Sequence, residues 1–126
     1  MRIAAVEGSF SVCKVADFSR VDFERPFVFA CRTDKERSLV CPSDAVPANA
    51  TARDDGWRAF RVDGVLDFSL VGVLASISSC LAEAGVALFA VSTFDTDYVL
   101  TRAADFPRAL AALAAAGHEI LPASQR

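Results

Sequence analysis

The feature that most constrains the fold of this chain is an internal similarity at an offset of sixty residues. Without a gap, the shift aligns two hairpin-like segments and the turns that follow them: Phe29-Ala30 with Phe89-Ala90, Thr33 with Thr93, Leu39-Val40 with Val99-Leu100, and Pro47 with Pro107. A repeat of this kind indicates that one supersecondary plan is used twice. The sequence therefore predicts two tandem units of similar topology.

The sequence of the second unit predicts the element order β-α-β-β-α-β. An alternating segment, 57–62, predicts a strand that ends at the Asp63-Gly64 turn. A helix is expected over 68–84, with Asp67 as its N-cap and Gly85 as its left-handed end. The apolar segment 86–91 predicts a fully buried strand, and 97–101 predicts the strand returning from it. A second helix is expected to begin with Asp105 as its cap and to end at Gly117, before a final strand over 118–121.

The sequence of the first unit predicts the same order of elements, with less room for the first helix. Strands are expected over 10–15, 27–31 and 37–41, and the continuous apolar segment 27–31 predicts a central strand buried on both faces. Only eleven residues separate Val15 from Phe27, against twenty-three between Val62 and Val86, so only a turn or a short helix fits there. The segment 47–56 reads as a linker. We therefore expect an α/β, ferredoxin-like fold, with a degenerate first unit over 1–56 and a complete second unit over 57–126.

Composition excludes several classes of protein. Hydrophobic residues make up 53% of the 126 residues, which suffices for a buried core. The formal net charge is −3 and no basic run occurs, so nucleic acid is not an expected partner. No apolar run reaches the roughly 20 residues that span a bilayer, and the N-terminus does not read as a secretion signal. We expect a cytoplasmic protein that does not associate with membranes.

The cysteines do not predict a metal centre or a disulfide framework. Cys13, Cys31, Cys41 and Cys80 form no Cys-x-x-Cys pair, and His118 is the only histidine. This set of residues is a poor match for zinc, and three of the cysteines lie in apolar strand patterns. We expect four reduced thiols, no bound metal and no cofactor.

Three segments carry a resemblance to a known family. The segments 57–62, 67–72 and 89–100 resemble ACT-domain proteins, most specifically through the stretch from Ser92 to Leu100. Within that family the chain is similar to small bacterial tandem-ACT proteins related to the CASTOR arginine sensors and to the regulatory domains of aspartate kinase. ACT domains are ferredoxin-like, pair side by side through their sheets and commonly bind amino acids at the interface. The resemblance thus implies a regulatory, non-catalytic protein that binds a small molecule, and it allows a homodimer.

The resemblance also implies where the ligand binds, since ACT domains generally use the turn after the first strand and the strand facing it. On this chain those positions are Asp63, Gly64, Val65, Leu66, Asp67, Ser92, Thr93 and Asp97. Their chemistry is suitable, because carboxylates accept from an ammonium group while hydroxyls and turn N–H groups donate to a carboxylate. Each has an ordinary structural role as well: Asp63 as a turn residue, Asp67 as a helix cap, Ser92 and Thr93 as loop formers.

Two other functions are compatible with the sequence. An enzyme with a cysteine nucleophile would need a base, and His118 follows a helix end where a structural role suffices. Asp95 and Asp97 could serve as paired carboxylates, but alternate residues of a strand point to opposite faces. The other alternative is an interaction module that dimerises and binds a protein without any small ligand. A screen for thermal stabilisation by metabolites separates the ligand-binding class from both.

Overall fold

The computed structural model describes residues 1–66 and 71–123, and the chain divides into two compact units. Met1–Glu7 together with Arg58–Arg126 form one unit, which we call the helical unit. Gly8–Trp57 form the other, which we call the strand unit. Two long strands, β1 (Arg2–Val15) and β4 (Ala50–Val62), contribute residues to both units.

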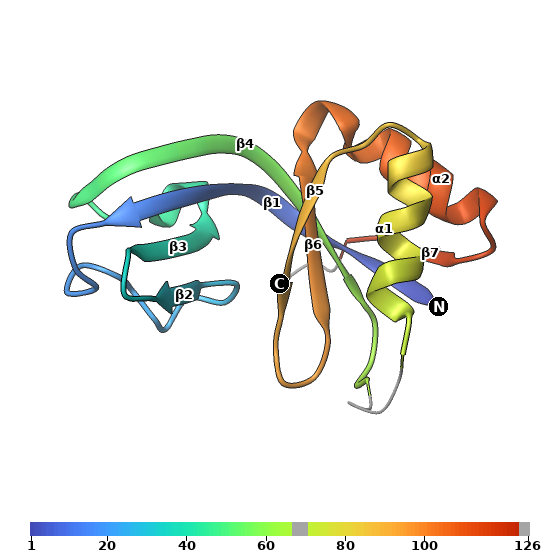
Figure 1. Cartoon of the computed structure of the whole chain (residues 1–126). Helices are drawn as coiled ribbons and strands as arrows, with labels where there is room; N and C mark the ends of the chain where they lie inside the picture. The colour runs from blue at the N-terminus through green and yellow to red at the C-terminus, as the bar shows by residue number, and fades with distance from the viewer. Residues whose placement is uncertain (67–70, 124–126) are drawn as a thin grey trace. The chain divides into compact units, whose positions relative to one another are not determined.

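The helical unit has the expected order, with β4 followed by α1, β5, β6, α2 and β7 (Figure 1). Its strands lie in the order β7-β1-β4-β6-β5, and β5 and β6 form an antiparallel hairpin. The N-terminal end of β1 lies between β4 and β7 in this sheet and pairs in parallel with β7. The ferredoxin-like α/β fold is thus confirmed. The bounds of the remaining elements are α1 Val73–Glu83, β5 Leu88–Ser92, β6 Asp97–Arg102, α2 Phe106–Ala115 and β7 Glu119–Leu121.

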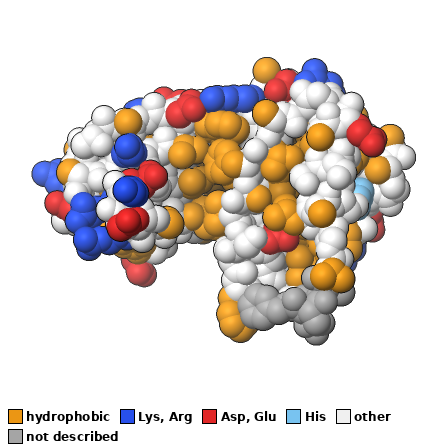
Figure 2. Space-filling view, in the orientation of Figure 1, with side chains coloured by type: hydrophobic (Ala, Val, Ile, Leu, Met, Phe, Trp, Pro, Cys, Tyr) orange, Lys and Arg blue, Asp and Glu red, His pale blue; other side chains and the backbone are white. Residues whose placement is uncertain are grey.

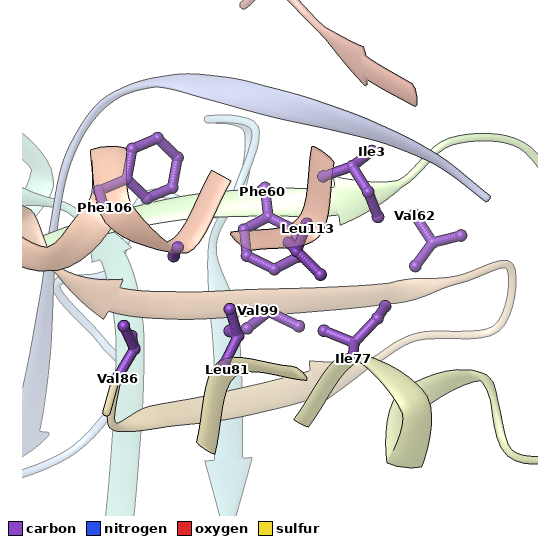
Figure 3. Packing of buried hydrophobic residues seen from close by; sticks show 10 residues of the cluster. Ile3, Phe60, Val62, Ile77, Leu81, Val86, Val99, Phe106 and Leu113 are labelled. Atoms are coloured by element: carbon purple, nitrogen blue, oxygen red, sulfur yellow. The ribbon is translucent and has the colours of Figure 1, made fainter. Parts of the chain in front are cut away.

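Both helices pack on one face of this sheet and enclose its core (Figure 3). The core combines strand residues with helix residues, all of them buried: Ile3, Phe60, Val62, Val86, Val99, Ile77, Leu81, Phe106, Ala109 and Leu113. Side chains alternate between the two faces of a strand. Because Phe60, Val62 and Val99 point to the helices, their neighbours Arg61, Asp63 and Tyr98 belong to the opposite face, which we call the open face.

The ends of the two helices confirm the glycine predictions. After α1, Gly85 has φ 73° and Val86 N donates to Leu81 O at 2.9 Å. After α2, Gly117 has φ 100° and His118 N donates to Leu113 O at 3.1 Å. These are the 6→1 hydrogen bonds of a Schellman motif, in which glycine accepts the left-handed conformation without steric cost.

The beginnings of the helices differ from the predictions. The first helix begins at Val73, not at 68, and its N-cap is Gly72 in a left-handed conformation. Phe68 and the predicted cap Asp67 lie outside the described residues. Asp105 does stand at the N-cap of α2, but no side-chain hydrogen bond caps this helix. Its carboxylate instead accepts a 3.3 Å hydrogen bond from Arg108, so the predicted capping interaction is wrong.

The strand unit has a ferredoxin-like strand order without α-helices. Its strands lie in the order β2-β3-β1-β4, and all of its residues are described. Turns occupy 17–27, where the sequence allowed a turn or a short helix. The buried side chains Cys13, Val15, Leu39 and Cys41 are covered by Phe18 and Val21 from this stretch and by Val28 directly after it. The bounds of its own elements are β2 Phe29–Arg32, β3 Arg37–Pro42 and the 3-10 turn η1 Ser43–Ala45.

The hairpins of the two units share one register. Phe29 pairs with Val40 on β3, and Phe89 pairs with Leu100 on β6, so both partners are offset by sixty residues. Both turns are closed alike: Thr33 N donates to Glu36 O at 2.9 Å and Thr93 N donates to Thr96 O at 2.8 Å. The 3-10 turns also correspond, at Ser43–Ala45 and Ala103–Asp105. The internal similarity of the sequence therefore reflects equivalent backbone positions.

Two strand predictions and one linker prediction are wrong. The strands expected to be buried on both faces, 27–31 and 86–91, correspond to β2 and β5, which lie at sheet edges and keep exposed residues. Continuous apolar sequence indicates two faces that avoid water, but each of these strands pairs with one neighbour only. The expected linker 47–56 is largely strand, since β4 begins at Ala50. Thr51 to Gly56 are exposed, and an exposed strand of this composition resembles a loop.

On the face that Figure 2 shows, basic and acidic side chains are interspersed over the strand unit. Neither described helix has the length and apolar character that crossing a membrane demands.

Candidate ligand-binding site

The β5–β6 turn of the helical unit gathers most of the polar side chains predicted for the site. Ser92 and Asp97 are cross-strand partners, and the Ser92 hydroxyl donates to Asp97 Oδ1 at 2.6 Å. The Thr93 hydroxyl donates to the carbonyl of Thr96 at 3.0 Å. A carboxylate and two hydroxyls are thereby held at the closed end of a hairpin.

Two hydrogen bonds join this turn to the segment that follows β4. The buried Thr96 hydroxyl donates to the carbonyl of Val62 at 2.7 Å. The backbone N–H of Leu66 donates to the carbonyl of Asp95 at 2.7 Å. The loop after β4 and the turn of the β5–β6 hairpin are therefore placed by direct contacts. The site was expected to be built from these two parts of the fold.

A cavity of about 330 Å³ lies between this turn and the start of α1. We call it the helix-face cavity. Its described lining residues are Leu66, Gly72, Val73, Leu74, Ala75, Ser92, Thr93, Phe94, Asp95, Thr96 and Asp97. The first helical turn contributes backbone N–H groups that have no acceptor inside the helix, and these favour anionic groups. The opposite wall offers the carboxylates of Asp95 and Asp97. The cavity thus has a donor side and an acceptor side.

A second cavity of about 330 Å³ lies beside the same turn. We call it the open-face cavity, because Arg61, Asp63 and Tyr98 belong to the open face of the sheet. Its described lining residues are Arg61, Val62, Asp63, Gly64, Val65, Thr93, Asp95, Thr96 and Tyr98. Arg61 donates a 3.3 Å hydrogen bond to the Tyr98 hydroxyl. Asp63 lies 3.7 Å from the guanidinium of Arg2, an ion pair with both partners partly exposed.

The structure distributes the predicted site residues between these two cavities. Leu66, Ser92 and Asp97 line the helix-face cavity, while Asp63, Gly64 and Val65 line the open-face cavity. Thr93 lines both, and Asp67 lies outside the described residues. The split follows from strand alternation, since Asp63 is one residue beyond Val62, which points to the helices.

Sequence reasoning missed several lining residues. The first turn of α1 was missed because the helix was expected to begin five residues earlier. Arg61 and Tyr98 were missed because the resemblance implied a site at 63–67 and at Ser92, Thr93 and Asp97, and neither residue is among those positions. Alternation was a usable signal for Arg61, since it lies between two apolar residues, Phe60 and Val62, of an expected strand.

The described residues hold no group suited to a metal ion. Within 1–66 and 71–123, no cluster of three His, Cys, Asp or Glu side chains has the arrangement of a metal site. All four cysteines are free thiols, with Cys13 and Cys41 buried, Cys31 exposed and Cys80 intermediate. Burial raises the pKa of both Cys13 and Cys41, that of Cys41 to about 12. These two thiols are therefore poor nucleophiles at neutral pH.

The architecture matches solved structures of similar size. A crystallised protein from Agobacterium tumefaciens is 32% identical, with a TM-score of 0.86 over 99% of this chain and 95% of that chain. A protein of unknown function from Vibrio cholerae is 18% identical, with a TM-score of 0.68 over 88% of this chain and 85% of that one. The ligand-free regulatory subunit of aspartate kinase from Thermus thermophilus is 12% identical, with a TM-score of 0.62 over 91% and 97%. No curated protein matches the chain.

A family match agrees with this likeness. The ACT domain matches residues 52–115, which is just over half of the chain. The matched segment contains most of β4, both helices and the β5–β6 hairpin, and so it includes the turn around which both cavities lie. The chain therefore belongs to the ACT domain family.

Proposed function

We propose that this chain is a non-catalytic regulatory protein that binds an amino acid, or a closely related zwitterion, in the helix-face cavity. The observation that carries the proposal is the polarity of that cavity. Backbone N–H groups from the first turn of α1 stand on one side, and the Asp97 carboxylate, oriented by Ser92, stands on the other. A free amino acid carries the two complementary groups, a carboxylate and an ammonium.

The regulatory part of the proposal is supported by the family and by the likeness to the regulatory subunit of aspartate kinase from Thermus thermophilus. A cavity of about 330 Å³ has the size of a small-ligand site. We further propose that the protein acts in the cytoplasm and that two copies can pair through their sheets. Both β2 and β5 lie at sheet edges, and such edges can pair with another chain.

We also propose that the two units are two copies of one ACT domain, the first degenerate and the second complete. The shared hairpin register supports this proposal, as do the corresponding 3-10 turns. The strand unit has only turns where the helical unit has α1. We therefore assign ligand binding to the helical unit.

A second candidate function, protein interaction without a small ligand, is favoured by one observation. Three of the large exposed apolar side chains, Val65, Val71 and Phe94, belong to the segments next to the cavities and are 75%, 93% and 79% exposed. Figure 2 shows exposed hydrophobic side chains where the β5–β6 hairpin turns. Grouped exposed apolar residues are typical of contact surfaces.

The test is a melting-temperature screen of the whole chain against the twenty amino acids and a set of non-zwitterionic metabolites. Ligand at a hundredfold over its Kd should stabilise the fold by about 2.7 kcal/mol, a rise of several degrees in Tm. Stabilisation by one amino acid, or by a few related ones, supports the proposal. An absence of any shift at millimolar concentrations contradicts it and favours the interaction module.

A further inference from the structure

The open-face cavity contains a cation that the rest of the described structure leaves without an opposite charge. Within residues 1–66 and 71–123, the guanidinium of Arg61 donates one hydrogen bond, to the Tyr98 hydroxyl, and forms no ion pair. A guanidinium presents five N–H donors in a planar fork that suits a carboxylate. The hydrogen bond to Tyr98 orients the guanidinium and uses one of these donors, so the other N–H groups remain available to an acceptor on a ligand. The cavity therefore offers an oriented donor for an anionic group.

The same cavity is also lined by two carboxylates, those of Asp63 and Asp95. The Asp95 carboxylate is exposed, and Asp63 is only loosely paired with Arg2, at 3.7 Å. A ligand with negative charge alone would meet two carboxylates there, and a ligand with positive charge alone would meet Arg61. A ligand that carries both a carboxylate and an ammonium can pair with Arg61 and with these carboxylates at once.

The strand unit has a cation at the position equivalent to Arg61, but it lacks the equivalents of Asp63 and Asp95, where Ala16 and Lys35 stand. Ala16 N donates to Asn49 O as Asp63 N donates to Arg2 O, so these two strand ends are equivalent. Lys14 is two residues before Ala16, and Arg61 is two residues before Asp63, so Lys14 occupies the position equivalent to Arg61. Lys14 lies opposite Ser38, which is sixty residues before Tyr98. A cavity of about 230 Å³ lies beside Lys14, Glu36 and Ser38.

The two units differ in what holds the cation. Arg61 is held by the Tyr98 hydroxyl, whereas the Ser38 hydroxyl donates to Glu36 instead. A lysine also lacks the fork that gives two parallel hydrogen bonds. The helical unit therefore has the better prepared of the two cavities.

We propose that the open-face cavity is a second binding site for a small zwitterionic carboxylate, with the carboxylate on Arg61 and the ammonium on Asp95 and Asp63. This site is distinct from the helix-face cavity and goes beyond the function proposed above. The turn residues Thr93, Asp95 and Thr96 line both cavities. One ligand molecule in each cavity would therefore contact a shared wall.

The experiment is a nuclear magnetic resonance titration of the isotope-labelled whole chain with L-alanine up to 50 mM, with propionate and ethylamine as single-charge probes. The Arg61 side-chain Nε–H signal reports the open-face cavity, and the Ser92 and Leu74 amides report the helix-face cavity. We expect L-alanine to shift the Arg61 signal in a saturable manner. Propionate should require at least about tenfold more, because it lacks the ammonium, and ethylamine should leave the signal unchanged.

Two variants and one control complete the test. Because these variants lack the Arg61 signal, the Tyr98 amide reports the open-face cavity in them. Arg61→Gln should remove the saturable response of this amide to L-alanine, and Arg61→Lys, which keeps the charge, should weaken the binding about tenfold. Lys14→Gln, at the equivalent position, should leave the response unchanged. An unmoved Arg61 signal, equal responses to alanine and propionate, or loss of binding in Lys14→Gln would each overturn the proposal. Shifts at Ser92 and Leu74 alone would overturn it and leave the helix-face site standing, whereas shifts at Arg61 alone would do the reverse.

Discussion

The Thr96 hydroxyl donates a 2.7 Å hydrogen bond to the main-chain carbonyl of Val62, and this bond is buried. It joins the turn of the β5–β6 hairpin to the end of β4, the two places that carry the candidate site residues. Thr96 is one of three buried polar residues among those described, together with Ser11 and Thr101. The bond therefore positions the walls of both cavities and also contributes to folding.

We expect Thr96→Val to destabilise the protein by about 1–3 kcal/mol, because it leaves the buried carbonyl of Val62 without its donor at nearly unchanged side-chain volume. Thr96→Ser keeps the hydroxyl and should cost much less. Urea denaturation of the two variants measures the difference. Equal stability of the Val and Ser variants would show that the hydrogen bond does not hold the turn.

The cysteines provide a second prediction, on reactivity. Burial raises the pKa of the Cys41 thiol to about 12 and raises that of Cys13, so at pH 8 both are almost wholly protonated. Cys31 is exposed on the edge strand β2. A thiol reagent at pH 8 should modify Cys31 first, and Cys13 and Cys41 only on unfolding. Mass spectrometry of the labelled peptides, with Cys31→Ser as control, checks the order; labelling of Cys41 at the rate of Cys31 would refute it.

A third prediction concerns acid. Hydrogen bonds from Ser11 and from Arg53 hold the pKa of Asp55 below its ordinary value. A carboxylate whose pKa is lower in the folded than in the unfolded protein stabilises the fold above the unfolded pKa, near 4, and loses that contribution as pH falls through the folded value. Because Asp55 is exposed, the effect should be small.

Asp55→Asn removes this contribution, so the stability difference between the wild type and this variant should shrink steadily as the pH falls from about 5 to 2. Urea midpoints across that range provide the measurement. A difference that stays constant with pH would mean that the ionisation of Asp55 does not contribute to folding.

Local chemistry made much of the fold predictable. Gly85 and Gly117 end their helices in the left-handed conformation that glycine tolerates, and the hairpins follow from the sixty-residue similarity. What could not be predicted depends on distant pairing. The N-terminal residues 2–4 of β1 pair with β7, more than a hundred residues later, and the first half of β4 is exposed and polar. Neither segment carries the alternation of a half-buried strand.

The candidate site was predictable to a similar degree. Ser92, Thr93 and Asp97 come together because they belong to one hairpin turn, which is a local relationship. Asp63 was expected beside them, but strand alternation places it with Arg61 on the open face. The contribution of α1 depends on where the helix begins, and Gly72 rather than an acidic cap stands there.

The central claim is that Asp97 binds the ammonium group of an amino acid, and calorimetric titration of its Asn variant tests it most directly. The titrant is the amino acid that most raises the melting temperature of the wild type. Asp34→Asn, in the equivalent turn of the strand unit, is the matched control. We predict that Asp97→Asn raises Kd about tenfold or more, because one charge-assisted hydrogen bond is lost, while Asp34→Asn leaves Kd unchanged. An Asp97→Asn variant that binds as tightly as the wild type would contradict the account.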